Sequence, residues 1–162
     1  MKFNYFIPVL VFFPVLILQT TIIPLIAIQG IIPDLILILL VYFTINNGQI
    51  FGTVQGFVYG LLFDLITGSL LGSAMLAKTL SGFVAGYFSN ENKRDFYLRS
   101  YMFSVIVLIC AVIDSMIFSF LSSADLTTNI FSLFFENGIV SGIYTSVISL
   151  LILVFFILRR RF

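Results

Sequence analysis

Residues 52–86 read GTVQGFVYGLLFDLITGSLLGSAMLAKTLSGFVAG, and this stretch decides the fold. Its glycines recur mostly at intervals of four, so each half of the stretch places them on one stripe of a helix. A turn near residue 71 makes the two halves antiparallel, and small residues let such helices approach closely in a membrane. The glycines predicted to pack are Gly52, Gly56, Gly60, Gly68, Gly82 and Gly86.

Two opposite charges lie on the same stripes. In a hairpin that turns near residue 71, facing positions have numbers that add to 142, and Asp64 and Lys78 satisfy that sum. A lone charge in hydrocarbon costs at least about 2.5–3.5 kcal/mol on insertion scales. The pattern therefore predicts an intramembrane ion pair between Asp64 and Lys78. Such a pair could fix helix register or take part in signalling or partner binding, and a proton or substrate site at Asp64 is the third interpretation.

The rest of the chain is equally apolar. Of its 162 residues, 60% are hydrophobic and 9% are charged, and the mean hydropathy is +1.18. Soluble domains carry about a quarter of their residues as charged side chains. Because a transmembrane helix needs about 20 apolar residues, the chain has room for about six spans and no separate soluble domain.

The sequence thus predicts an all-α, polytopic membrane protein that forms a compact bundle of six transmembrane helices. Glycine, proline and polar clusters separate the apolar runs. The first run is long and lacks a small-residue cleavage pattern, so we expect an uncleaved span rather than a signal peptide. We expect one integral membrane domain over residues 1–162, with spans at about 3–28, 31–45, 50–66, 71–88, 100–121 and 138–158.

The positive charges predict the orientation. Every Lys and Arg except Lys78 lies near an end of a predicted span, and such residues tend to stay in the cytoplasm. Six spans place all of them on one side, with both termini cytoplasmic. Besides Lys2, the residues that predict this topology are Lys93, Arg94, Arg99, Arg159, Arg160 and Arg161.

Other polar residues occur inside the predicted spans. We expect Gln19 and Asp114 to be buried in the bundle, where Asp114 would be protonated or hydrogen-bonded. Pro33 and Asp34 fit a helix start at the outer face, with proline in the first turn and a carboxylate at the positive end of the helix dipole. A partner-facing role for Asp34 stays open. Small polar residues of the last span favour helix packing over ligand binding; they are Gly138, Ser141, Gly142, Thr145, Ser146 and Ser149.

The sequence lacks the residues that several kinds of functional site require. The chain has no His, and its single cysteine, Cys110, cannot form an internal disulfide or a thiolate zinc cluster. The net charge of +1 argues against a nucleic-acid partner. We expect no catalytic set, no metal site and no cofactor. An intramembrane enzyme would need Asp64 and Asp114 to face one cavity as an acid and a base, and no sequence pattern links them.

The order of these residues resembles a known family. The similarity is best over residues 19–86, and it extends to the whole chain in length, span count and basic tail. The family is the rod shape-determining protein MreD of bacteria. The residues that carry the resemblance are Gln19, Pro33, Asp34, Leu35, Gly52, Gly56, Phe57, Gly60, Leu61, Asp64, Gly68, Gly72, Leu80, Gly82 and Gly86.

The resemblance implies a function and partners. It implies a non-enzymatic scaffold or adaptor of the cell-elongation machinery, which builds peptidoglycan, in the bacterial cytoplasmic (inner) membrane. The implied partners are MreC and, with it, RodA, a class B penicillin-binding transpeptidase and MreB filaments, besides membrane lipid. The family is also similar to the six-span substrate-binding components of energy-coupling vitamin transporters, so a solute-binding subunit is the alternative function.

Overall fold

The computed structural model describes residues 6–27, 31–90, 92–122 and 139–159, and its fold is all-α as predicted. Each of the six predicted spans corresponds to a long helix. The elements are α1 (Phe6–Thr21), the 3-10 helix η2 (Ile23–Ile26), α2 (Leu35–Asn47), α3 (Gln49–Thr67), α4 (Ser73–Gly86), α5 (Arg94–Arg99), α6 (Met102–Ser122) and α8 (Val140–Arg159).

The helices differ from the prediction in one boundary and one additional helix. The first span was expected to reach residue 28, but α1 ends at Thr21 and η2 follows it. Pro24 explains the break, because proline has no N–H and its ring clashes with the carbonyl four residues earlier. The charged loop after the fourth span also contains a short helix, α5, which the sequence pattern did not predict.

The apolar character of the helices fits a membrane protein. α3 and α6 are each long and apolar enough to cross a membrane. Shorter apolar segments occupy Ile7–Thr21, Leu35–Asn47 and Val140–Phe155 in the described part of the chain. The crossing of the bilayer by all six helices stays a prediction.

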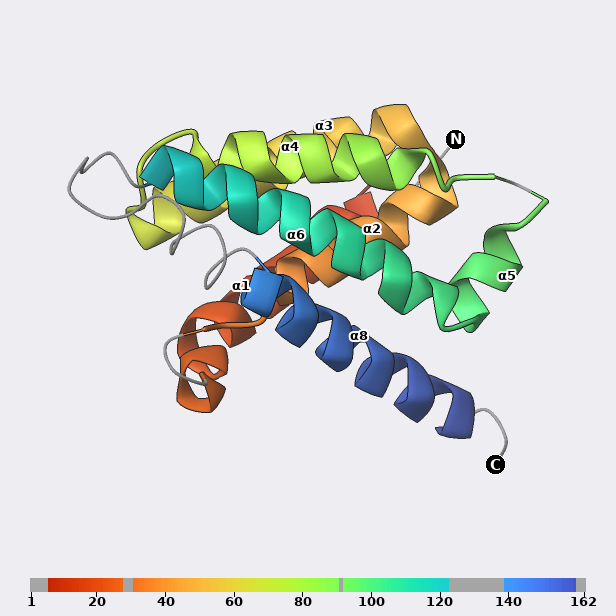
Figure 1. Cartoon of the computed structure of the whole chain (residues 1–162). Helices are drawn as coiled ribbons and strands as arrows, with labels where there is room; N and C mark the ends of the chain where they lie inside the picture. The colour runs from red at the N-terminus through yellow and green to blue at the C-terminus, as the bar shows by residue number, and fades with distance from the viewer. Residues whose placement is uncertain (1–5, 28–30, 91, 123–138, 160–162) are drawn as a thin grey trace.

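The hairpin of α3 and α4 is the most extensive helix contact among the described residues. α4 also packs on α6, and α6 packs on α8, whose axis runs in a similar direction below it (Figure 1). α2 is the central helix and contacts α1, α3, α4 and α6. The apolar core surrounds it, with Ile36, Leu37, Leu40 and Val41 fully buried.

Glycines line the contact between α3 and α4, but in a different register from the predicted one. A Cβ added to Gly56 would collide with the backbone of Lys78, and one added to Gly60 would collide with that of Ala74. Gly82 likewise lies against the backbone of Gly52. The residue numbers of these facing pairs add to 134 rather than to 142. The two glycine stripes are therefore shifted along each other by about two helical turns from the predicted register.

The other predicted packing glycines have different neighbours. Gly86 lies against Gln49 of α3, and Gly52 also touches the side chain of Thr44 in α2. Gly68 does not pack at all, which corrects the prediction for it. It ends α3 with a φ of 69°, in the left-handed conformation that glycine adopts without a steric penalty.

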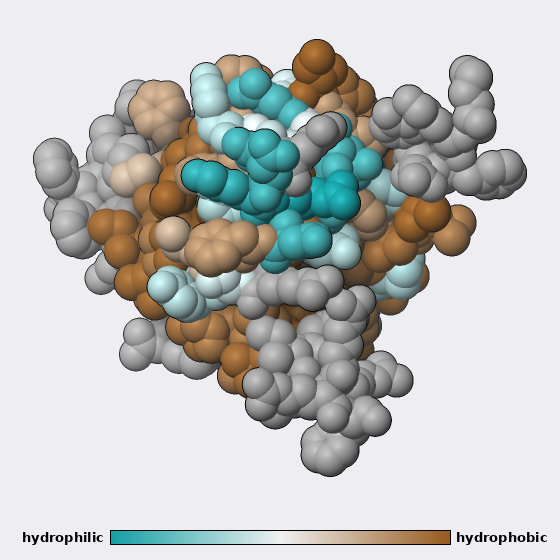
Figure 2. All heavy atoms as spheres, turned by 90° about the vertical axis from the view of Figure 1, so that its right-hand side faces the viewer, coloured by the Kyte–Doolittle hydropathy of each residue, from teal (hydrophilic) through white to brown (hydrophobic). Residues whose placement is uncertain are grey.

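One end of the molecule is polar. Figure 2 looks onto this end and shows hydrophilic residues at its centre and hydrophobic residues around them. The turn between α2 and α3, helix α5 and the end of α8 lie on this side, at the right of Figure 1. Its exposed polar residues include Asn47, Asn90, Asn92, Lys93, Arg94 and Asp95.

The topology residues are described only in part. Lys93 and Arg94 are exposed at the polar end, as the prediction requires. Arg99 ends α5 and Arg159 ends α8, but their side chains are not described. Lys2, Arg160 and Arg161 lie outside the described residues, as does Gly138.

Candidate functional site

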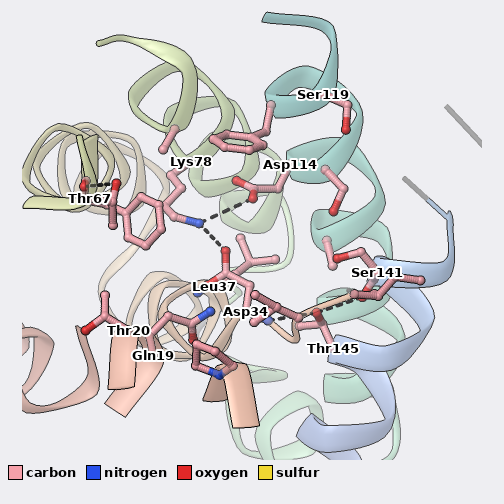
Figure 3. A pocket seen from close by; sticks show the side chains of 18 of the residues that line it. Gln19, Thr20, Asp34, Leu37, Thr67, Lys78, Asp114, Ser119, Ser141 and Thr145 are labelled. Atoms are coloured by element: carbon pink, nitrogen blue, oxygen red, sulfur yellow. Dashed lines mark hydrogen bonds and ion pairs between the residues drawn. The ribbon is translucent and has the colours of Figure 1, made fainter. Parts of the chain in front are cut away.

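Lys78 of α4 is the centre of the site. Its side chain is 3% exposed, and its Nζ forms ion pairs with Asp34 and with Asp114. Figure 3 shows the nitrogen between the two carboxylates, with Asp34 at the start of α2 and Asp114 on α6. A cation buried among membrane helices requires such partners because hydrocarbon cannot solvate it. One lysine therefore connects three helices.

The predicted ion pair between Asp64 and Lys78 is wrong. Asp64 is 1% exposed and lies at the end of α3, where it accepts hydrogen bonds from the backbone N–H of Gly72 at 2.9 Å and of Met75 at 3.1 Å. It also accepts from the N–H of Ala74 at 3.2 Å and from the hydroxyl of Ser69 at 2.6 Å.

The shifted hairpin register is the physical reason. It places Asp64 beside the turn and the first residues of α4, and it places Lys78 deeper, beside Gly56. The first N–H groups of a helix have no partners within the helix and carry partial positive charge, so a carboxylate stabilises them. Asp64 therefore fixes the connection between α3 and α4 rather than neutralising a lysine.

Asp34 is the N-cap of α2. One carboxylate oxygen accepts from the N–H of Leu37 at 2.9 Å, and the other accepts from Lys78. The predicted helix start at this position is confirmed, with one difference. Pro33 precedes the cap and lies outside the helix rather than in its first turn. The cap leaves one oxygen of Asp34 free for the lysine, so a single carboxylate has both roles.

Two further helices hold the start of α2 in place. Gln19 of α1 donates from Nε2 to the carbonyl of Pro33 at 2.8 Å and accepts from the N–H of Leu35 at 2.9 Å. Thr145 of α8 accepts from the N–H of Asp34 at 3.1 Å. Gln19 is 9% exposed, so the prediction that it is a buried polar residue is confirmed. The start of α2 is thus bonded to α1, α4 and α8.

Asp114 is buried as predicted, with 7% of its surface exposed. Its Oδ2 lies 3.4 Å from Nζ of Lys78. Its Oδ1 has no hydrogen-bond partner among the residues that the structure describes. If all three side chains are ionised, the cluster of Lys78, Asp34 and Asp114 carries one net negative charge.

A partly open pocket of about 780 Å³ lies over this cluster. Residues toward the ends of α1, α3 and α6 and at the starts of α2, α4 and α8 line it, so it lies toward the end of the bundle opposite α5. Asp64 does not line the pocket, so the acid and base pair that an intramembrane enzyme would need is not assembled there. Apolar residues such as Phe63, Ile66 and Phe118 form part of the wall, and the polar lining includes Gln19, Thr20, Asp34, Thr67, Lys78, Asp114, Ser115, Ser119, Ser141 and Thr145.

A second polar cluster joins α6 to α8. Ser104 donates to the carbonyl of Ser146 at 2.7 Å, and Ser149 donates to the hydroxyl of Ser104 at 3.1 Å. Gly142 lies against Val112 of α6 in the same interface. These contacts support the prediction that the small polar face of the last span serves helix packing, although Ser141 and Thr145 reach the pocket.

The sequence pattern missed the pairing of Lys78 with Asp34 and Asp114. The pairing could have been found by comparing how far each charged residue lies from the end of its helix, over all helices. Lys78 lies one and a half turns from the start of α4, Asp34 directly precedes α2, and Asp114 lies about two turns from the end of α6. All three helix ends lie on the side of the molecule opposite α5, so the charges share one region of the bundle.

Comparison with known proteins identifies the family. The model of the family described as rod shape-determining protein MreD matches residues 1–161. No curated protein and no solved structure matches the chain. Because the family match covers nearly every residue of this apolar helical protein, the chain belongs to the MreD family, whose role is in determining the rod shape of cells.

Proposed function

We propose that this protein is a non-enzymatic scaffold of the cell-elongation machinery in the cytoplasmic membrane, where it binds MreC. Through MreC it would work with RodA, a class B penicillin-binding transpeptidase and MreB filaments. Membership in a rod shape-determining family supports the process. The partners come from the family resemblance.

One structural observation supports the scaffold role. Lys78, Asp114 and Asp64 of the described membrane helices are buried and bonded to other helices, and large apolar side chains cover the outer faces. On α8, for example, the exposed apolar side chains include those of Ile143, Val147, Leu151 and Phe155. Such a bundle is held together from inside and offers outward faces against which transmembrane segments of other proteins can pack.

The proposed topology has six spans and two cytoplasmic ends. The exposed Lys93 and Arg94 lie at the polar end of the molecule, with the end of α8 on the same side. Because basic residues near span ends favour the cytoplasm, this end would face the cytoplasm. The pocket over Lys78 would then lie toward the outer leaflet.

Depletion and replacement in the native host test the function. Depletion should round the rod-shaped cells, and a plasmid copy should restore the rods and retain MreC when it is purified from membranes. Lys78→Met should restore neither, because it leaves the buried Asp114 and the half-buried Asp34 without a cation. Lys93→Met, which removes an exposed lysine, is the matched control and should restore both. Normal rods after depletion would refute the proposal.

The pocket is the observation that favours the alternative function, a solute-binding subunit of an energy-coupling vitamin transporter. Its volume of about 780 Å³ is within the range of small-molecule sites. Purified protein would then carry a vitamin or melt at a higher temperature when the vitamin is added. A vitamin-dependent shift together with normal cell shape after depletion would select this alternative.

A further inference from the structure

The pocket over Lys78 contains an unsatisfied acceptor. Asp114 lines the pocket, nine-tenths of its side chain is buried, and its Oδ1 has no donor in the described part of the chain. Folded proteins rarely leave a buried carboxylate oxygen without a partner, since its desolvation is then not compensated. The terminal torsion of an Asp side chain is soft, so a rotation of the carboxylate allows this oxygen to meet a donor in the pocket.

The charge of the cluster indicates which group fits. With all three side chains ionised, Lys78 neutralises one of the two carboxylates, and the site then favours a donor that is itself positive. The hydroxyls of Ser115 and Ser119 on the same helix supply further acceptors. Phe118 also lines the pocket, and aromatic rings attract cations. The ring of Phe63 already faces Nζ of Lys78, at 5.8 Å from the ring centroid.

The walls indicate the rest of the ligand. Ile31, Ile32 and Ile66 line the pocket together with the two phenylalanines, and the whole site lies among apolar helices. A polar floor under apolar walls suits an amphiphile with a small charged headgroup. We propose that this pocket binds a primary ammonium group carried by an amphiphile, with Asp114 accepting its hydrogen bond. This inference goes beyond the scaffold function and does not depend on it.

Lipid headgroups provide a matched pair of probes. Phosphatidylethanolamine has three N–H donors on its nitrogen, whereas phosphatidylcholine has none and is otherwise the same zwitterion. We would purify the full chain in detergent and measure its melting temperature against the concentration of each short-chain lipid, with decylamine as the non-lipid amine. Phosphatidylethanolamine should raise the melting temperature in a saturable way, and phosphatidylcholine should not. A rise with decylamine alone would assign the ammonium to a ligand other than this lipid.

Two variants test the role of Asp114. Asp114→Asn should weaken amine binding by about tenfold, because the hydrogen bond between two charged groups becomes one between an ammonium and a neutral amide. Asp95→Asn makes the same chemical change at an exposed position in α5 and should bind as the natural protein does. Equal shifts with both lipids and no shift with decylamine, or full binding by Asp114→Asn, would overturn the proposal.

A second measurement uses the unaltered protein in case Asp114→Asn does not fold. Dicyclohexylcarbodiimide, which modifies carboxyl groups in apolar surroundings, would be added with and without each lipid, and the peptide containing Asp114 would be quantified by mass spectrometry. Phosphatidylethanolamine should slow the modification of Asp114 relative to phosphatidylcholine. Equal rates would overturn the proposal and leave the scaffold function untouched, since that function is judged by cell shape.

Discussion

At the residue scale, Lys78 is the side chain that connects three helices by charge. It is the cation between Asp34 of the α2 cap and Asp114 of α6, and it is almost completely buried. A buried ion pair is not necessarily stabilising compared with apolar residues, but removing one partner is costly because the other charge stays buried. The cluster therefore makes assembly of α2, α4 and α6 sensitive to single substitutions.

We predict that Lys78→Met lowers the free energy of unfolding in detergent by about 3–5 kcal/mol. Adding Asp34→Asn and Asp114→Asn to it should recover part of this loss, because the uncompensated charges are then gone. Thermal melting monitored by circular dichroism would measure the effect, and Lys93→Met would be the exposed control. A triple variant no more stable than Lys78→Met would contradict the cluster.

Asp64 has a separate role at the same scale. Its donors are the hydroxyls of Ser69 and Ser73 and the N–H groups of Gly72, Ala74 and Met75. An amide in its place keeps one oxygen and turns an NH₂ group toward N–H donors. We predict that Asp64→Asn destabilises the protein by about 1–3 kcal/mol. Asp95→Asn, on exposed α5, should change the stability little.

A double-mutant cycle distinguishes this arrangement from the ion pair that the sequence pattern predicts. Since Asp64 and Lys78 are not partners in the structure, the effects of Asp64→Asn and Lys78→Met should add within about 0.5 kcal/mol. The effects of Asp34→Asn and Lys78→Met should not add. Coupling between Asp64 and Lys78, with none between Asp34 and Lys78, would support the ion pair that the sequence pattern predicts.

At the scale of the elements, backbone contact holds the hairpin of α3 and α4 together. Gly60 and Gly56 of α3 lie directly against the backbone of α4. This close approach also sets the depth of Lys78, because its own carbonyl lies beside Gly56. Helix packing and charge pairing are thus coupled, since a change in hairpin register moves Lys78 relative to Asp34 and Asp114.

We predict that Gly60→Ala separates α3 from α4 and costs about 1–3 kcal/mol, the usual range for overpacking. The added methyl group would meet the carbonyl of Ala74 and the Cα of Met75, and neither can rotate away. Val54→Ala on the exposed face of the same helix is the control for a small change in side-chain size. Unchanged melting of Gly60→Ala would show that the helices are less close than the structure has them.

At the scale of the whole molecule, polarity divides the two ends of the bundle. The end with α5 exposes basic and amide side chains, and the opposite end contains the pocket and the turn between α3 and α4. Between the ends, exposed apolar side chains cover the outer surface of the helices. This distribution suits a protein that spans a membrane in one fixed orientation.

We predict opposite accessibilities for two single cysteines in a Cys110→Ala background. Leu71→Cys, in the exposed turn before α4, should react with a membrane-impermeant maleimide on intact cells or spheroplasts. Asn92→Cys, just before α5, should react only after the membrane is permeabilised. α4 is the one described helix between the two positions. If both cysteines were labelled from the same side, α4 would not cross the membrane and the prediction of six spans would be refuted.

The sequence by itself determined the class of the protein, the order and approximate bounds of its six long helices, and the close hairpin of α3 and α4. Those properties follow from composition, apolar run length and glycine spacing, which are local along the chain. It also indicated that Gln19 and Asp114 are buried, because polar groups within apolar spans avoid lipid.

Only the tertiary structure decided which charges meet. Spacing fixes the face of a helix on which a residue lies, but not how far two packed helices slide along each other. Relative to the predicted register, α3 and α4 are shifted along each other by about two turns. Asp64 therefore lies beside the start of α4, and Lys78 pairs with Asp34 and Asp114 instead. Both partners come from other helices, so the pairing within α3 and α4 that spacing suggested could not reveal them. The pocket likewise exists only where the ends of five long helices and the start of α2 meet.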